Sequence, residues 1–115
     1  MKVDLTAKKN RKFIRIAVPC KIFISAPRKN IIDTHTENIG GGGIRVNIKD
    51  GLPLLSIVGL ELDLKMKKII TQGKILYSLS KGTPLYYSTG IEFHNMKEVD
   101  RRLVNNFIKK IILES

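Results

Sequence analysis

Hydrophobic and polar residues alternate along most of the chain, which is the pattern of strands that bury one face. The alternation is clearest from Phe13 to Ile24, where it predicts a single strand with its apolar side chains on one face. Those side chains are Ile14, Ile16, Val18, Cys20, Ile22 and Ile24. Pro19 lies on the opposite face and cannot donate to a sheet ladder, so this strand is expected at an edge or a bulge.

The alternation returns in later segments that are separated by turn residues. Further strands are predicted over about residues 31–38, 44–48, 58–66, 69–77 and 87–93. Ser, Gly and Pro between residues 78 and 84 predict a loop before the last strand.

The period changes after residue 94. Apolar residues recur at helical spacing from Val99 to Ile111, and polar or basic residues fill the opposite face. Asn95 and Glu98 have the spacing of an N-cap and an N3 residue, which predicts a helix that begins near Met96.

The predicted fold is mainly β, with a six-stranded antiparallel barrel over about residues 13–94 and one amphipathic C-terminal helix over about residues 96–113. Closing the sheet into a barrel removes its exposed edges. A chain of 115 residues has room for one core, so residues 13–115 are expected to form a single domain. Residues 1–12 are expected to form a flexible basic arm, and no segment is apolar enough to predict membrane insertion.

Charge is the outlying feature of the composition. Lys and Arg number 21 against 10 Asp and Glu, and the resulting net charge of +11 attracts anions such as phosphates or nucleic acid. The one cysteine, Cys20, excludes an internal disulfide, is expected to fill the core and indicates a cytoplasmic protein. His35 and His94 are far apart, and Asp33 and His35 are expected on a solvated face. No catalytic or metal-binding constellation is predicted, so we expect neither an enzyme nor a bound cofactor.

Two motifs suit an anionic ligand. Gly40 to Gly43 lie between two strands and lack the Lys-Ser/Thr ending of a P-loop. They either permit a tight turn or bulge with φ above zero or let backbone amides approach an anion. Five of the eight residues from Lys8 to Arg15 are basic, and they are either a solvated charge run or a grip for a ligand. Arg11 and Arg15 are four residues apart, and arginine binds phosphate or a guanine edge bidentately.

The order and spacing of these motifs resemble the PilZ domain family, which includes bacterial receptors for the second messenger cyclic di-GMP. The family pattern is Arg-x-x-x-Arg followed further along the chain by Asp/Asn-x-Ser-x-x-Gly. Residues 11–15 match the first part, and residues 38–43 match the second part except at Gly40. The resemblance covers nearly the whole chain and also implies a six-stranded barrel with a C-terminal helix.

The resemblance implies a role for each matched residue. Arg11 and Arg15 would bind guanine and phosphate groups, Asn38 would contact a guanine, and Gly43 would allow close approach. Gly40 belongs to the same motif, and Lys12, Gly41 and Gly42 are additional candidate contacts.

Gly40 stands where the family pattern has serine. Losing a neutral hydrogen bond costs about 0.5–1.5 kcal/mol, or about 1.5–3 kcal/mol if the acceptor is a charged phosphate. The expected loss of affinity is therefore a few-fold to about a hundredfold. Gly40→Ser is expected to strengthen binding, provided that the backbone there accommodates a side chain.

Three functions follow from these observations. The first is a cyclic di-GMP receptor whose ligand orders the N-terminal arm and thereby signals to a separate effector protein, with motility, secretion or polysaccharide machinery as candidates from the resemblance. The second is a PilZ-like adaptor that binds proteins but no nucleotide. The third is an RNA-binding or single-stranded-DNA-binding barrel. The adjacent Tyr86 and Tyr87 point to opposite faces of a strand and make a poor stacking platform, so no nucleic acid is expected.

Overall fold

The computed structural model describes residues 2–4, 14–65 and 67–114, which form eight strands and one helix. The elements are β1 (Lys2–Asp4), β2 (Arg15–Ala17), β3 (Lys21–Ser25), β4 (Ile32–Gly40), β5 (Gly43–Ile48), β6 (Ile57–Asp63), β7 (Lys68–Lys81), β8 (Tyr86–His94) and α1 (Glu98–Glu114).

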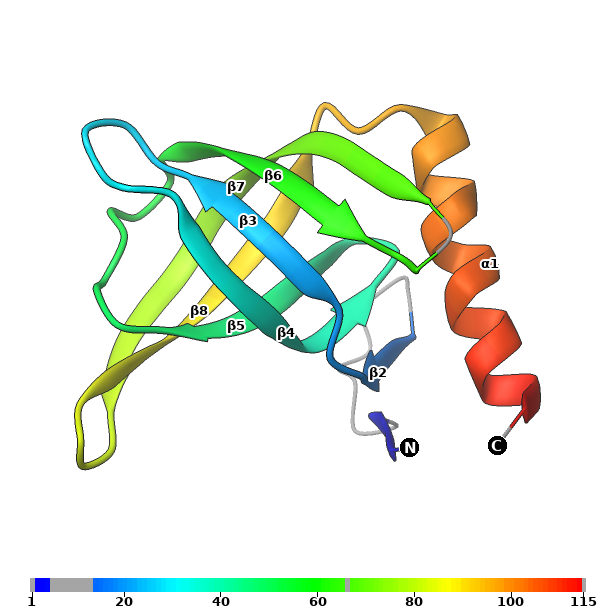
Figure 1. Ribbon diagram of the computed structural model, residues 1–115, viewed down its shortest axis with the longest axis horizontal. Helices are drawn as coiled ribbons and strands as arrows, with labels where there is room; N and C mark the ends of the chain where they lie inside the picture. Colours follow the sequence, from blue (N-terminus) through cyan, green and yellow to red (C-terminus); the bar gives the residue numbers. More distant parts are fainter. Residues whose placement is uncertain (1, 5–13, 66, 115) are drawn as a thin grey trace.

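Six of the strands described close into an antiparallel barrel in the order β4, β3, β6, β7, β8 and β5, and the β4–β5 pairing completes the ring. Strand β2 runs beside β4 beyond the end of β3, and β1 pairs with the outer edge of β2. Helix α1 lies at one end of the barrel (Figure 1). The predicted barrel with one C-terminal helix is confirmed, and β1 is an additional strand that the alternation did not predict.

Inward-facing aliphatic side chains fill the barrel. Helix α1 adds Val104 and Ile108 to this core, which buries one stripe of the helix against the open end of the barrel. Cys20 is buried among the apolar residues, as predicted. The largest fully buried side chains are Ile16, Ile22, Ile24, Ile39, Ile44, Val46, Val58, Leu60, Leu62, Ile69, Ile75 and Ile91.

The single strand predicted from Phe13 to Ile24 is wrong, because the chain breaks around Pro19 into β2 and β3. The hydroxyl of Thr36 bridges the break: it accepts a hydrogen bond from the Cys20 amide at 2.9 Å and donates one to the Val18 carbonyl at 2.8 Å. The Thr36 amide donates in turn to the Cys20 carbonyl at 2.9 Å. Strand β4 thus binds both halves of the broken strand.

The prediction that the apolar side chains of this strand share one buried face is wrong for the first of them, Ile14. Ile14 is 52% exposed, whereas Ile16 is fully buried in β2. Phe13, where the strand was predicted to begin, lies outside the residues that the structure describes.

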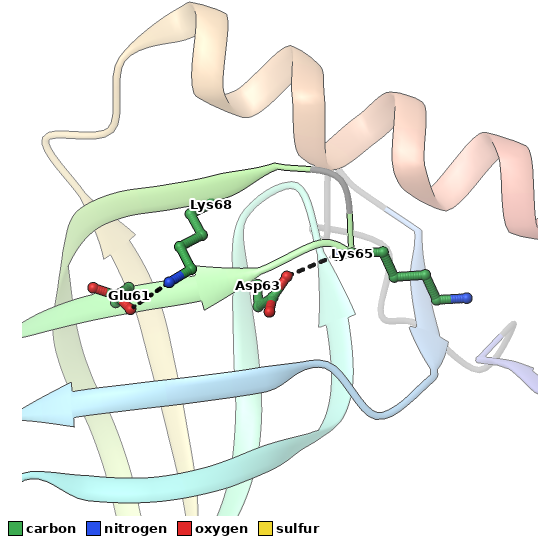
Figure 2. A network of polar contacts seen from close by, with 4 residues as sticks. All are labelled: Glu61, Asp63, Lys65 and Lys68. Carbon is green, nitrogen blue, oxygen red and sulfur yellow. Dashed lines mark hydrogen bonds and ion pairs between the residues drawn. The ribbon is translucent and has the colours of Figure 1, made fainter.

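Two other boundaries differ from the prediction for local reasons. Strand β7 runs on to Lys81 through the predicted loop, since Ser78 pairs with Thr89 across the ladder and their hydroxyls lie 2.9 Å apart. Strand β6 ends at Asp63 and not near residue 66. Lys65 has a left-handed φ of 72°, and its amide donates to Asp63 Oδ1 at 2.9 Å (Figure 2).

The helix begins at Glu98, two residues later than predicted. Asn95 is not the N-cap, because it precedes the helix by three residues and turns the chain with a φ of 54°. The Glu98 carboxylate lies 3.6 Å from Arg101 Nε, one turn along the helix. The predicted capping box is therefore wrong, and the acidic side chains of the first turn instead face the positive end of the helix dipole.

We expect Thr36→Val to lower the free energy of unfolding by about 1–3 kcal/mol, because it leaves the Cys20 amide and the Val18 carbonyl without their partner. Urea unfolding followed by circular dichroism measures the change. Thr34→Val on the same strand is the control, and equal losses in the two variants would contradict the bridging role of Thr36.

Burial raises the pKa of the Cys20 thiol to about 11 from an ordinary value of 9.0. The thiol therefore contributes stability that is fully present below about pH 9 and is lost as the pH rises towards 11. Two pKa units correspond to about 2–3 kcal/mol. We expect the unfolding free energy of the wild type to fall by about this much more than that of Cys20→Ala between these pH values, and parallel pH profiles would refute the assignment.

Candidate functional site

The β4–β5 hairpin brings the second motif to one face of the barrel. Gly40 is opposite Gly43 and Ile39 is opposite Ile44, with Gly41 and Gly42 between the strands. Ile39 and Ile44 point into the core, so their neighbours face outwards. A register shift between Thr36 and Asn38 lets Thr36 face inwards and places Asn38 on the outer face opposite Arg45.

Strand β2 delivers one arginine of the first motif to the same place. Arg15 pairs with Gly40, and its side chain is half-buried. A Cβ added to Gly40 would lie 2.8 Å from Arg15 Cγ and 2.9 Å from the Ile14 carbonyl oxygen. Glycine at position 40 is therefore what allows β2 to approach β4 this closely.

The outer face next to this contact holds two polar atoms without partners. Asn38 is only 8% exposed, and its Oδ1 is buried with no hydrogen-bond partner in the described part of the chain. The same holds for Nε of the half-buried Arg45 across the ladder. Buried polar atoms are nearly always hydrogen-bonded in native proteins, so this pair is suited to a ligand that offers both a donor and an acceptor.

The glycine turn is held by its neighbours. The Gly41 carbonyl accepts a hydrogen bond of 2.6 Å from Arg101 Nη1 of α1, and the Gly42 carbonyl accepts one of 3.0 Å from the Phe93 amide. A Cβ on Gly43 would collide with the Ile91 carbonyl oxygen. The expected φ above zero is not found in this turn.

Among the described glycines, a left-handed φ occurs at Gly82 alone. Close packing therefore requires glycine at positions 40 and 43. This corrects the interpretation that the glycines are needed for a turn or bulge with φ above zero. The structure thus brings together Arg15, Asn38, Gly40 and Gly43, whereas Arg11 and Lys12 lie outside the described residues.

Two residues of this region were not predicted. The position of Arg45 follows from the sequence once Gly41 and Gly42 are recognised as a two-residue turn. Gly40 is then opposite Gly43, and two residues further from the turn Asn38 is opposite Arg45, on the same outward face. Arg101 is one of several basic residues on the polar face of α1, and only the packing of α1 against the barrel distinguishes it.

Other candidate chemistry does not gather at this site. Asp33 and His35 are exposed, as predicted. Within the residues that the structure describes, no three His, Cys, Asp or Glu side chains are grouped so that they could hold a metal ion. The helix in this part of the chain is not long and apolar enough to cross a membrane.

Comparison with protein families identifies the chain. Residues 9–110 match the PilZ domain, so the chain belongs to the PilZ domain family. No enzymatic family is indicated. No curated protein sequence matches the chain significantly.

Solved structures share the fold at low sequence identity. The Bacillus subtilis inhibitor of motility MotI/DgrA superimposes with a TM-score of 0.79 at 18% identity, over 94% of this chain and 53% of that one. Escherichia coli YcgR in complex with c-di-GMP gives 0.77 at 12%, over 91% and 47% of the two chains. The K. pneumonia MrkH complex with c-di-GMP gives 0.74 at 16%, over 94% and 55%. The chain therefore spans about half the length of these three proteins.

We expect Gly40→Ser to destabilise the fold by about 1–3 kcal/mol, because the new Cβ must displace Arg15 and the Ile14 carbonyl. Gly40→Ser is expected to strengthen ligand binding only if the backbone accommodates a side chain at position 40, and this condition is not met. Gly59→Ser is the matched control, since a Cβ there would meet only Ser25 at an ordinary 3.5 Å. Thermal unfolding of both variants measures the difference, and a Gly40→Ser protein as stable as Gly59→Ser would contradict the close approach.

Proposed function

We propose that this protein is a cytoplasmic receptor for cyclic di-GMP that signals to a separate effector protein. The observation that carries the proposal is the position of Arg15 beside Gly40 and near Asn38, because the two halves of the motif, far apart in the sequence, lie on one outer face. Membership of the PilZ family supports it. So do the YcgR and MrkH structures, which contain c-di-GMP.

The chemistry of the residues suits a guanine dinucleotide. The Arg15 guanidinium binds a phosphate or the O6 and N7 acceptors of guanine. The unpartnered Asn38 Oδ1 accepts from the amino edge of guanine, which offers N–H donors. Arg11 provides a second guanidinium four residues before Arg15, and Lys12 adds positive charge.

The pairing of β2 with β4 and β1 gives this receptor a partly preformed site. The backbone of Arg15 is paired with a strand on both sides, so ordering this backbone adds little to the entropic cost when the ligand binds. We place the ligand-induced ordering in the remainder of the basic arm, which includes Arg11. Ligand binding changes the affinity for the effector by no more than the difference between the ligand's affinities for the ordered and the free arm.

A second function, that of a ligand-independent adaptor, is favoured by one observation. Gly40 lacks the hydroxyl of the family motif, and β2 fills the space where a side chain would stand. We propose it as the alternative if nucleotide does not bind. Nucleic acid is the third candidate, and the half-buried Tyr87 and the exposed Tyr86 on opposite faces offer no continuous stacking surface.

Isothermal titration calorimetry with cyclic di-GMP tests the receptor. We expect saturable binding that weakens about tenfold to a hundredfold in Arg11→Ala and in Arg15→Ala, the loss of about 1.5–3 kcal/mol for a charged hydrogen bond. Arg102→Ala removes the same charge from an exposed position on α1 and should bind as the wild type does.

Controls separate the three functions. GTP, cyclic di-AMP and single-stranded RNA or DNA should produce no comparable heat, and amide hydrogen exchange in residues 5–13 should slow only with cyclic di-GMP. A folded wild type that gives no heat at several temperatures would refute the receptor and favour the adaptor. Binding of polynucleotide that weakens steeply with salt would favour the third function.

A further inference from the structure

A groove separates helix α1 from the turn between β6 and β7, and its lining includes none of the candidate ligand-site residues. It has a volume of about 310 Å³. Three apolar residues of α1, Leu103, Phe107 and Ile111, recur at every fourth position along its side and are half-buried. Leu64, which directly follows β6, completes the apolar floor. The apolar stripe of α1 is therefore wider than the barrel covers.

The rim of this groove is positively charged. Lys65 and Lys67 come from the turn and Lys110 comes from α1, whereas Glu114 is the one carboxylate among the lining residues. None of these lysines takes part in an ion pair within the described residues. The groove therefore combines an apolar floor with cations that form no ion pair with the residues that the structure describes.

The acidic residues near the turn are already engaged, as Figure 2 shows. Glu61 lies 3.7 Å from Lys68 Nζ, and Asp63 accepts a hydrogen bond from the Lys65 amide. The latter bond holds the turn in its left-handed conformation, and the Lys65 side chain extends away from both carboxylates (Figure 2). Glu61 and Asp63 therefore do not pair with the side chains of Lys65 and Lys67, which can bind the carboxylates of a partner.

We propose that this groove docks an acidic, apolar segment of a partner protein, with large aliphatic or aromatic side chains on the floor and carboxylates on the lysine rim. Complementary charge selects the partner, and burial of the floor supplies the affinity. A membrane surface fits less well, because the apolar side chains form the floor of a groove and do not project. Nucleic acid would use the lysines and leave the floor exposed. The proposal does not depend on cyclic di-GMP.

A displayed library of short random peptides, panned on the wild-type protein without nucleotide, tests this docking site. We expect enrichment of peptides that combine Asp or Glu with Leu, Ile or Phe. Lys67→Glu/Lys110→Glu should weaken the best peptide by about tenfold or more, as charge attraction becomes repulsion. Lys29→Glu/Lys49→Glu makes the same charge change at exposed positions on the β3–β4 and β5–β6 loops and should retain binding.

Chemical-shift mapping on the wild type locates the bound peptide without relying on any variant. Shifts at residues 64, 65, 67 and 103–111 would support the groove, and shifts confined to other surfaces would overturn it. Enrichment of basic or uncharged peptides, or equal losses in the two charge-reversed variants, would also overturn the proposal. If anionic lipid vesicles or single-stranded DNA bind more tightly than the best peptide, and do so through Lys67 and Lys110, the proposed protein partner is wrong and the groove binds a membrane or a nucleic acid.

Discussion

The hydroxyl of Thr36 joins two segments that Pro19 would otherwise separate. A proline cannot continue the ladder, yet β2 and β3 both lie along β4 because this hydroxyl accepts from one side of the break and donates to the other. The hydroxyl therefore helps to fix how β2, which pairs with β4 and β1, continues into β3. A small polar group in the core thus helps to set the course of the strand that carries Arg15.

The site end of the barrel is tied together by contacts to the backbone of the glycine turn. Arg101 of α1 and the Phe93 amide hold the carbonyls of the glycine turn, and Gly43 admits the backbone of β8. A ligand that shifts this turn would act directly on α1. The hydrogen bond to Gly41 gives the helix, whose far half carries the lysine-rimmed groove, a physical connection to the motif.

Much of this architecture could be predicted from the alternation of residues, because a half-buried strand and an amphipathic helix leave different periods. Pro19 predicted an edge or a bulge, but the bridging of the break could not be predicted, since the Thr36 hydroxyl that binds both sides lies far along the chain. Arg15 beside Gly40 required the β2–β4 register, which no local pattern contains. Asn95 had the spacing of a cap, but its backbone was needed to turn the chain into the helix.

The contact at Gly40 also limits how this chain can change. Serine differs from glycine only by a small side chain, yet a serine side chain at position 40 and the present course of β2 exclude each other. Accommodating a serine would require a compensating change that draws Ile14 and Arg15 away. The side chain that position 40 can carry and the course of β2 at residues 14 and 15 are thus physically coupled, so a change at one alters what the fold tolerates at the other.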